Sequence, residues 1–326
     1  MIFLRLFRNN RPTGIAVIFF LVFALFLPSI ISQRNISSSA GMPLYNLLFG
    51  VFPDLPLLNR ILALIITLIL GNILIQIGIR FQLQDFRSFM PAVFFILFTM
   101  ALPMNQKVNA ILIGSIFYIL CFAILFSVYD KPPDTFSVFS AGLVLAAGSM
   151  FYLKLIWFIP LIWISLGTLR SVTWREMVYP VIAFFLLGLF LFTWYWVVLN
   201  DPAEFIELLR RNLAFKGSWP DLHYSVFLYY GFFLLLVAIS SFRMLNKFQT
   251  MKTTVQNMYQ VLFYMFLAGI LFVVVIERFD PDSLVFVAFP VAFILSNYFH
   301  RKRNPWTHEL MMWILLALLV FVQFTI

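Results

Sequence analysis

The chain has 326 residues, of which 63% are hydrophobic and only 11% are charged. A typical soluble domain is about 45–50% apolar and about 25% charged, so this chain would leave much apolar surface in contact with water. A lipid bilayer accepts such surface, provided that the backbone polar groups pair internally. The composition therefore excludes an ordinary soluble domain and indicates a membrane protein.

The apolar segments are continuous rather than alternating. The ranges 181–199 and 261–276 are apolar on nearly all sides, whereas the strands of a membrane barrel alternate apolar and polar residues over about ten positions. We therefore predict an all-α protein, a polytopic bundle of transmembrane helices that forms a single integral membrane domain over residues 1–326.

Polar breaks divide the chain into about eleven predicted spans. A span needs about 20 apolar residues, although bilayer thinning accommodates shorter ones. The first span follows Arg5, Arg8 and Arg11 and ends without a small-residue cleavage site, so we expect it to remain as an anchor. The predicted spans lie near 13–31, 61–79, 89–103, 109–128, 136–153, 155–169, 178–199, 224–242, 257–276, 283–298 and 308–325.

The distribution of Lys and Arg predicts the orientation, because these residues concentrate on cytoplasmic loops. With a cytoplasmic N-terminus, 14 of the 22 Lys and Arg fall on inner segments, and the formal net charge of +9 lies on that side. Such a face attracts anionic lipid head groups. We therefore expect a multi-pass protein of the cell inner membrane, with membrane lipids as partners and no nucleic acid.

Two predicted external loops, 32–60 and 200–223, are long enough to contain structure. In the first loop, the apolar range 42–53 is interrupted by prolines and a glycine, which predicts an interfacial helix rather than a span.

The second loop begins with residues that are typical of a helix start. Asp201 is a good N-cap, Pro202 suits the first helical position, and Glu204 completes the spacing of a capping box. A helix is predicted from Pro202 to about Phe215. Its apolar and charged residues alternate, so we expect it to lie flat on the outer leaflet.

Chemistry at a membrane surface needs ionisable side chains near the level of the lipid head groups. In the two external loops, Asp54, Arg60 and Arg210 are candidate catalytic residues, and Asp221 and His223 are candidate substrate-binding residues. The alternative for each loop acid is an ordinary hydrated charge.

A third charged segment, Glu277–Asp282, joins two predicted spans. Asp280 and Asp282 are two positions apart, as in loops that bind divalent cations through oxygen atoms. An Asp-Pro-Asp sequence is also a common turn in which one acid caps the next helix. We favour the turn and predict no metal and no cofactor. Lys154, between two short spans, is expected to extend to the outer interface.

Asn72 and Gln76 are polar residues inside the second predicted span. They are four positions apart and therefore share one helix face. Polar groups in a span are costly and usually find partners, so we expect this face to point into the bundle. It would either form hydrogen bonds between helices or bind a substrate along its path.

The chain resembles an uncharacterised family of polytopic inner-membrane proteins of the Bacteroidota. The resemblance rests on Asn9–Pro12, on Arg87 with Pro91, on Phe151–Tyr152 and on Trp174–Glu176. It implies an inner-membrane location and supplies no activity.

A fainter similarity is to membrane glycosyltransferases that depend on polyprenyl phosphate. These enzymes resemble the chain in their number of spans and in an interfacial helix, and they carry an essential acid in the first external loop, where this chain has Asp54. The family tends to place the acid soon after the first span, where this chain has Arg34. The similarity implies a polyprenyl-phosphate-linked substrate.

Three functions remain open from the sequence. The first is a component of cell-envelope or lipid-linked glycan handling at the external face, which in its enzymatic form would be a transferase that uses Asp54 and a basic partner such as Arg60 or Arg210. The second is a non-catalytic subunit that packs against other membrane proteins in a larger complex. The third is a lipid or small-solute transporter that uses the Asn72 and Gln76 face.

Overall fold

The computed structural model describes residues 12–32, 41–50, 55–84, 88–129, 135–214, 223–246, 248, 251–300 and 305–325. Within these ranges the chain forms helices and no strand. The predicted all-α class is therefore confirmed.

Seven of the described helical segments are long and apolar enough to cross a membrane. They are α4 (Pro56–Arg80), α6 (Ala110–Ser127), α9 (Trp174–Val197), α11 (Tyr224–Leu245), α12 (Thr253–Leu271) with the π turn η5 (Phe272–Ile276), the 3₁₀ turn η6 (Pro281–Leu284) with α13 (Val285–His300), and α14 (Pro305–Thr325).

Four other apolar segments are shorter or less fully described. They are α2 (Pro12–Ser32), α5 (Met90–Thr99), α7 (Thr135–Ser149), and the 3₁₀ turn η3 (Leu153–Phe158) with α8 (Ile159–Leu169). Each of the eleven predicted segments thus coincides with a helix. The number of membrane crossings and the orientation stay predictions.

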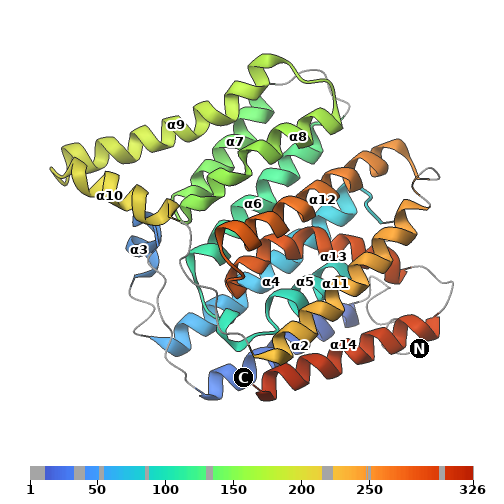
Figure 1. The fold of residues 1–326 in the computed structure, drawn as a ribbon. Helices are drawn as coiled ribbons and strands as arrows, with labels where there is room; N and C mark the ends of the chain where they lie inside the picture. The colour runs from blue at the N-terminus through green and yellow to red at the C-terminus, as the bar shows by residue number, and fades with distance from the viewer. Residues whose placement is uncertain are drawn as a thin grey trace.

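The two most buried helices, α5 and α13, occupy the centre of the bundle. All ten residues of α5 are buried, and so are nearly all residues of α13. Figure 1 shows these helices surrounded by α4, α6, α11 and α12, with α7, α8 and α9 forming a layer on one side and α2 and α14 lying along the opposite side.

Aromatic rings fill the interior between these helices. The Tyr118 ring packs against the rings of Phe122, Phe158 and Phe286, with centroid distances of 5.0, 4.8 and 5.3 Å. Tilted and edge-to-face contacts at such distances are favourable. The aromatic content of the sequence is thus used, in part, to pack this core.

Gly142 allows α7 and α9 to approach closely. A Cβ atom at this position would lie 2.7 Å from the Cα of Pro180 on α9. Small residues at helix contacts let backbones approach within a membrane, so Gly142 fixes how closely the outer layer can pack.

The connection between α12 and α13 has unusual backbone geometry. The Glu277 N–H donates to the Phe272 carbonyl over 3.1 Å, which closes the π turn η5. Arg278 and Phe279 then adopt φ values of 48° and 61°. Left-handed conformations in residues other than glycine are sparsely populated and cluster at functional sites.

Candidate functional site

Buried and half-buried polar side chains gather at one end of the bundle. α4 begins there, and the connections 100–109, 150–158 and 277–284 meet there. We call this set the polar end cluster, and its members are Asn59, Arg60, Asn105, Gln106, Lys107, Asn109, Tyr152, Lys154, Glu277 and Asp282. They come from four separate parts of the chain.

Two further helices, α3 (Pro43–Phe49) and α10 (Pro202–Leu213), lie at the same end of the molecule (Figure 1). The Tyr45 hydroxyl of α3 donates to the Val108 carbonyl over 3.1 Å, and the Met42 N–H donates to the Phe151 carbonyl over 3.4 Å. Both predicted loop helices therefore form, and hydrogen bonds join α3 and the residue before it to the connections 100–109 and 150–158 of the cluster.

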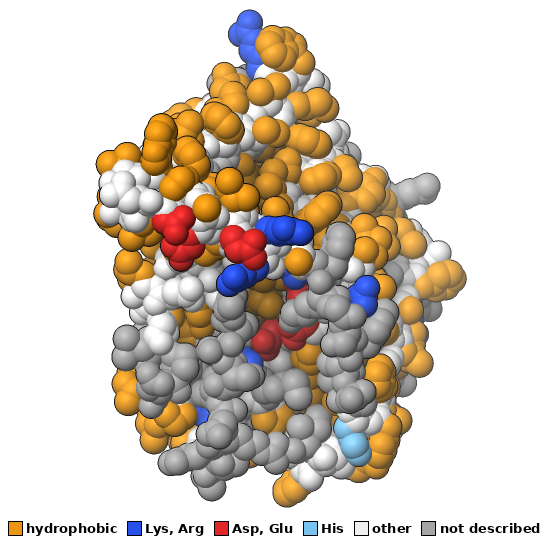
Figure 2. All heavy atoms as spheres, turned by 60° about the vertical axis from the view of Figure 1, so that its left-hand side comes forward, with side chains coloured by type: hydrophobic (Ala, Val, Ile, Leu, Met, Phe, Trp, Pro, Cys, Tyr) orange, Lys and Arg blue, Asp and Glu red, His pale blue; other side chains and the backbone are white. Residues whose placement is uncertain are grey.

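The α10 helix begins as the sequence predicts. The Asp201 carboxylate accepts from the Glu204 N–H over 3.0 Å, which confirms the N-cap. The Asp201 N–H donates to the Tyr195 carbonyl instead of to Glu204, so we see only one half of a capping box. Phe205 is buried against the Tyr195 ring, while the charged residues are exposed. Figure 2 shows acidic and basic side chains close together near the middle of the view, below a largely apolar upper part of the molecule.

Asn105 and Gln106 hold the connection between α5 and α6. Asn105 Nδ2 donates to the carbonyls of Thr99 and Pro281 over 3.1 and 3.0 Å, and Gln106 Nε2 donates to the Met100 carbonyl over 2.8 Å. Both side chains are buried, and Asn105 Oδ1 and Gln106 Oε1 accept no hydrogen bond within the described part of the chain. Since a buried acceptor without a donor is costly, these oxygens are candidate ligand-binding atoms.

Two more carboxamides shape the same connection. Asn59 Oδ1 accepts from the Val108 N–H and Asn109 Oδ1 accepts from the Leu112 N–H, both over 2.7 Å. The second of these bonds caps α6. The amide oxygens of Asn59 and Asn109 thus accept hydrogen bonds from backbone N–H groups that have no backbone acceptor in this irregular connection.

A buried ion pair links the connection 150–158 to the end of α12. Lys154 Nζ lies 2.6 Å from Glu277 Oε1, and the two side chains are only 8% and 1% exposed. The Tyr152 hydroxyl donates to the same carboxylate oxygen. The expectation that Lys154 extends to the outer interface is wrong, because its ammonium group has a carboxylate partner inside the protein. The hydrated-charge alternative is likewise wrong for Glu277.

Asp280 and Asp282 have different roles. The Asp280 carboxylate accepts from the Asp282 N–H over 3.2 Å and caps η6, as the turn interpretation predicts. Among the described residues, no group of three or more His, Cys, Asp or Glu side chains could hold a metal ion. Asp282 Oδ2 lies 3.8 Å from Lys107 Nζ.

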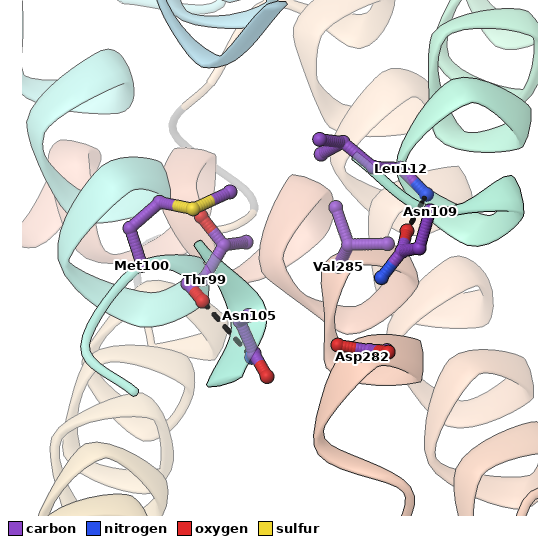
Figure 3. A pocket seen from close by; sticks show the side chains of 7 residues that line it. All are labelled: Thr99, Met100, Asn105, Asn109, Leu112, Asp282 and Val285. Atoms are coloured by element: carbon purple, nitrogen blue, oxygen red, sulfur yellow. Dashed lines mark hydrogen bonds between the residues drawn. The ribbon is translucent and has the colours of Figure 1, made fainter. Parts of the chain in front are cut away.

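Asp282 also lines a small pocket in the cluster. The other lining residues are Thr99, Met100, Asn105, Asn109, Leu112 and Val285. Figure 3 shows Thr99, Met100 and Asn105 on one side of this space, and Asn109, Leu112, Val285 and Asp282 on the other. Amide and carboxylate groups at a small opening suit the recognition of a single polar group, such as a hydroxyl, of a larger molecule.

The Tyr45 hydroxyl remains protonated at physiological pH. Burial raises the pKa of this phenol to about 12, and the negative charge of Asp282 contributes to the increase. Tyr45 therefore serves as a neutral donor to the Val108 carbonyl.

Two of the predicted catalytic residues, Arg60 and Arg210, lie in different surroundings. Arg60 is buried in the first turns of α4, next to Asn59, and so belongs to the cluster. Arg210 is exposed on α10. Asp54 lies outside the described residues.

Of the predicted substrate-binding residues, the three that the structure describes, His223, Asn72 and Gln76, do not join the cluster. Asp221 lies outside the described residues. His223 is the N-cap of α11, where its Nδ1 lies 2.9 Å from Ser225 Oγ. Asn72 and Gln76 are exposed on the outer surface of α4. The expectation that their face points into the bundle is wrong, because other faces of α4 make its contacts with α2, α5 and α6.

The sequence did not identify any of five members of the cluster as site residues: Asn59, Asn105, Gln106, Asn109 and Tyr152. One signal was present in the sequence: three carboxamides occur within the five residues 105–109, in a short connection between apolar segments. Such a density of amides is more than solvation of a short turn requires.

Comparisons of the chain with protein-family models, with curated proteins and with solved structures give no match. The chemistry of the polar end cluster is therefore the basis for a functional proposal.

Proposed function

We propose that the chain is a multi-pass protein of the inner membrane that binds the polar head of a lipid-linked substrate at the external face. It would serve cell-envelope or lipid-linked glycan handling. The observation that supports this proposal is the polar end cluster, in which Asn105 Oδ1 and Gln106 Oε1 are buried acceptors without donors among the described residues.

The position of the cluster fits an amphipathic substrate. The predicted orientation puts the connections 100–109, 150–158 and 277–284 on the external side. The two loop helices lie at this same end, where Phe205 of α10 packs in one apolar group with Leu153, next to Lys154. A head group bound there would leave its hydrocarbon chain in the bilayer.

The charges of the cluster fit a phosphorylated or glycosylated head. Arg60 and Lys107 supply positive charge, which suits a phosphate. Asn105, Asn109 and Asp282 supply amide and carboxylate groups, which suit hydroxyls. Asp54 remains the candidate catalytic acid of the enzymatic version of this proposal.

Native mass spectrometry of the protein purified with its membrane lipids tests the proposal. We expect a retained polyprenyl phosphate or glycolipid in the wild-type protein, and at least about tenfold lower retention in Asn105→Ala and Lys107→Ala. Arg211→Ala, at an exposed residue of α10, is the matched control and should retain the lipid. Ordinary phospholipids in the same amounts in all four proteins would refute the proposal.

The role of Asp54 needs a separate measurement. Once a bound lipid is identified, transfer or hydrolysis of its head group should be lost in Asp54→Asn while lipid retention is unchanged. Full activity of this variant would remove Asp54 from the mechanism and leave the binding site intact.

A second candidate function is a non-catalytic subunit of a larger complex, for which α9 would supply a helix surface that its own chain leaves uncovered. Only 11% of the most apolar window of this helix is buried, and its exposed residues are large and apolar. A protein that co-purifies in fixed stoichiometry, together with ordinary phospholipid only, would favour this function over the first.

A further inference from the structure

The exposed face of α4 is polar at two positions where a lipid-facing helix should be apolar. Asn72 and Gln76 lie on this face, within a 25-residue helix that is long enough to cross a membrane. A carboxamide group has two donor hydrogens and an acceptor oxygen. The hydrocarbon region offers no water to satisfy them.

Neither side chain has a hydrogen-bond partner among the described residues of its own chain. The opposite side of α4 already makes the contacts within the protein. There, a Cβ at Gly71 would lie 3.4 Å from Ala92 Cβ, and a Cβ at Gly78 would lie 3.4 Å from Phe293 Cε1. The two amides therefore face away from the packed side of the helix.

The exposed residues of this face follow a regular spacing. We call them the α4 seam, and they are Leu58, Ile61, Ile65, Ile69, Asn72, Gln76 and Ile79. Successive members are three or four positions apart, with a mean of 3.5 between Leu58 and Ile79. A period of 3.5 keeps one stripe facing a neighbouring helix in left-handed pairing, which is also the commonest packing of transmembrane helices.

The side chains of the seam suit such a pairing. β-branched isoleucines pack as knobs into the holes of a facing helix, and a single polar Asn in a seam fixes the register of the pair. Asn72 lies near the middle of α4, where a hydrogen bond across the interface would be most strongly favoured over exposure to lipid.

We propose that the α4 seam is the interface of a homodimer, in which Asn72 pairs with Asn72 of a second copy. Two copies in one membrane have the same orientation, so a two-fold axis along the membrane normal brings identical residues together at the same depth. A carboxamide is complementary to another carboxamide, since each donates N–H to the oxygen of the other. A second copy of the chain thus supplies both the donor and the acceptor that the Asn72 side chain needs, and no other protein is required.

Disulfide crosslinking in native membranes tests the contact directly. The single native cysteine, Cys121, is fully buried, so Ile69→Cys in the full-length protein should form crosslinked dimers upon oxidation. Phe185→Cys, on the exposed face of α9, is the matched control and should remain monomeric at the same protein density. Absence of an Ile69→Cys dimer, or a crosslink to a different protein, would overturn the proposal.

The role of the amides is tested by dissociation in lipid nanodiscs or vesicles, measured by single-molecule photobleaching. Asn72→Leu combined with Gln76→Leu should raise the dimer dissociation constant at least about tenfold, with the variant still eluting as a folded monomer. An unchanged dissociation constant would overturn the proposed role. Because Ile69→Cys keeps both amides, the crosslinking result stands even where the double variant fails to fold.

Discussion

Replacing Lys154 by methionine should strongly destabilise the protein. The substitution removes the cation that lies 2.6 Å from Glu277 Oε1 and leaves a carboxylate that is only 1% exposed. Loss of one partner from a buried ion pair costs about 3–5 kcal/mol, because the remaining charge has lost its counter-charge in a low-dielectric environment. Loss of an exposed ion pair costs only about 0–1 kcal/mol, so the measured free energy of unfolding distinguishes a buried pair from an exposed one.

The exposed pair of α10 provides the control. Arg211 Nε lies 3.0 Å from Glu207 Oε1, with side chains that are 77% and 50% exposed. Arg211→Ala should therefore lower the free energy of unfolding by less than about 1 kcal/mol. Both variants can be measured by reversible SDS unfolding in mixed micelles, followed by circular dichroism.

A double-mutant cycle then isolates the pair. Lys154→Met combined with Glu277→Gln removes both charges, keeps an acceptor for the Tyr152 hydroxyl, and should recover most of the lost stability, because no uncompensated charge remains buried. A cost below about 1 kcal/mol for Lys154→Met, or strictly additive costs in the double variant, would refute the conclusion that the pair is buried and coupled.

Two further predictions concern packing and the cluster. Asn59→Ala leaves the buried Val108 N–H without its acceptor and should lower the free energy of unfolding by about 1–3 kcal/mol, measured by the same SDS titration. Gly142→Ala forces a Cβ to within 2.7 Å of Pro180 and should cost about 1–3 kcal/mol, seen as a lower temperature of aggregation in detergent. Gly188→Ala meets no atom within 4 Å and should not lower that temperature; equal effects of the two glycine variants would contradict the close contact of α7 and α9.

The helices could be predicted because their signals are local. Continuous apolar runs bounded by charged residues gave all eleven segments, and the residues around Asp201 gave the start of α10. Both signals lie within one or two helical turns of sequence, so they need no knowledge of the partner helices.

The site could not be predicted in the same way, because its contacts join distant parts of the chain. Lys154 and Glu277 are 123 positions apart, and Asn105 and Pro281 are 176 positions apart. Charge and position in a loop do not distinguish a buried Glu277 from a hydrated one. Only the packing of α12 against α8 and the central helices decides this.

The orientation of Asn72 and Gln76 shows the same limit for an individual helix. Their spacing correctly placed both residues on one face, but a nearly uniform apolar helix carries little information about which face its neighbours cover. The small residues Gly71 and Gly78 mark the covered face instead.

The π turn at the end of α12 has a consequence for chain length. Such a turn holds one residue more than an α-helical turn, and its backbone bond between Glu277 and Phe272 absorbs that residue locally. Loss of Val274 could therefore be accommodated by conversion to α-helix, with the flanking side chains kept in place. The same deletion inside α4 would rotate all later residues by about 100°. Within this helical segment, a one-residue deletion should therefore be tolerated best between positions 272 and 276.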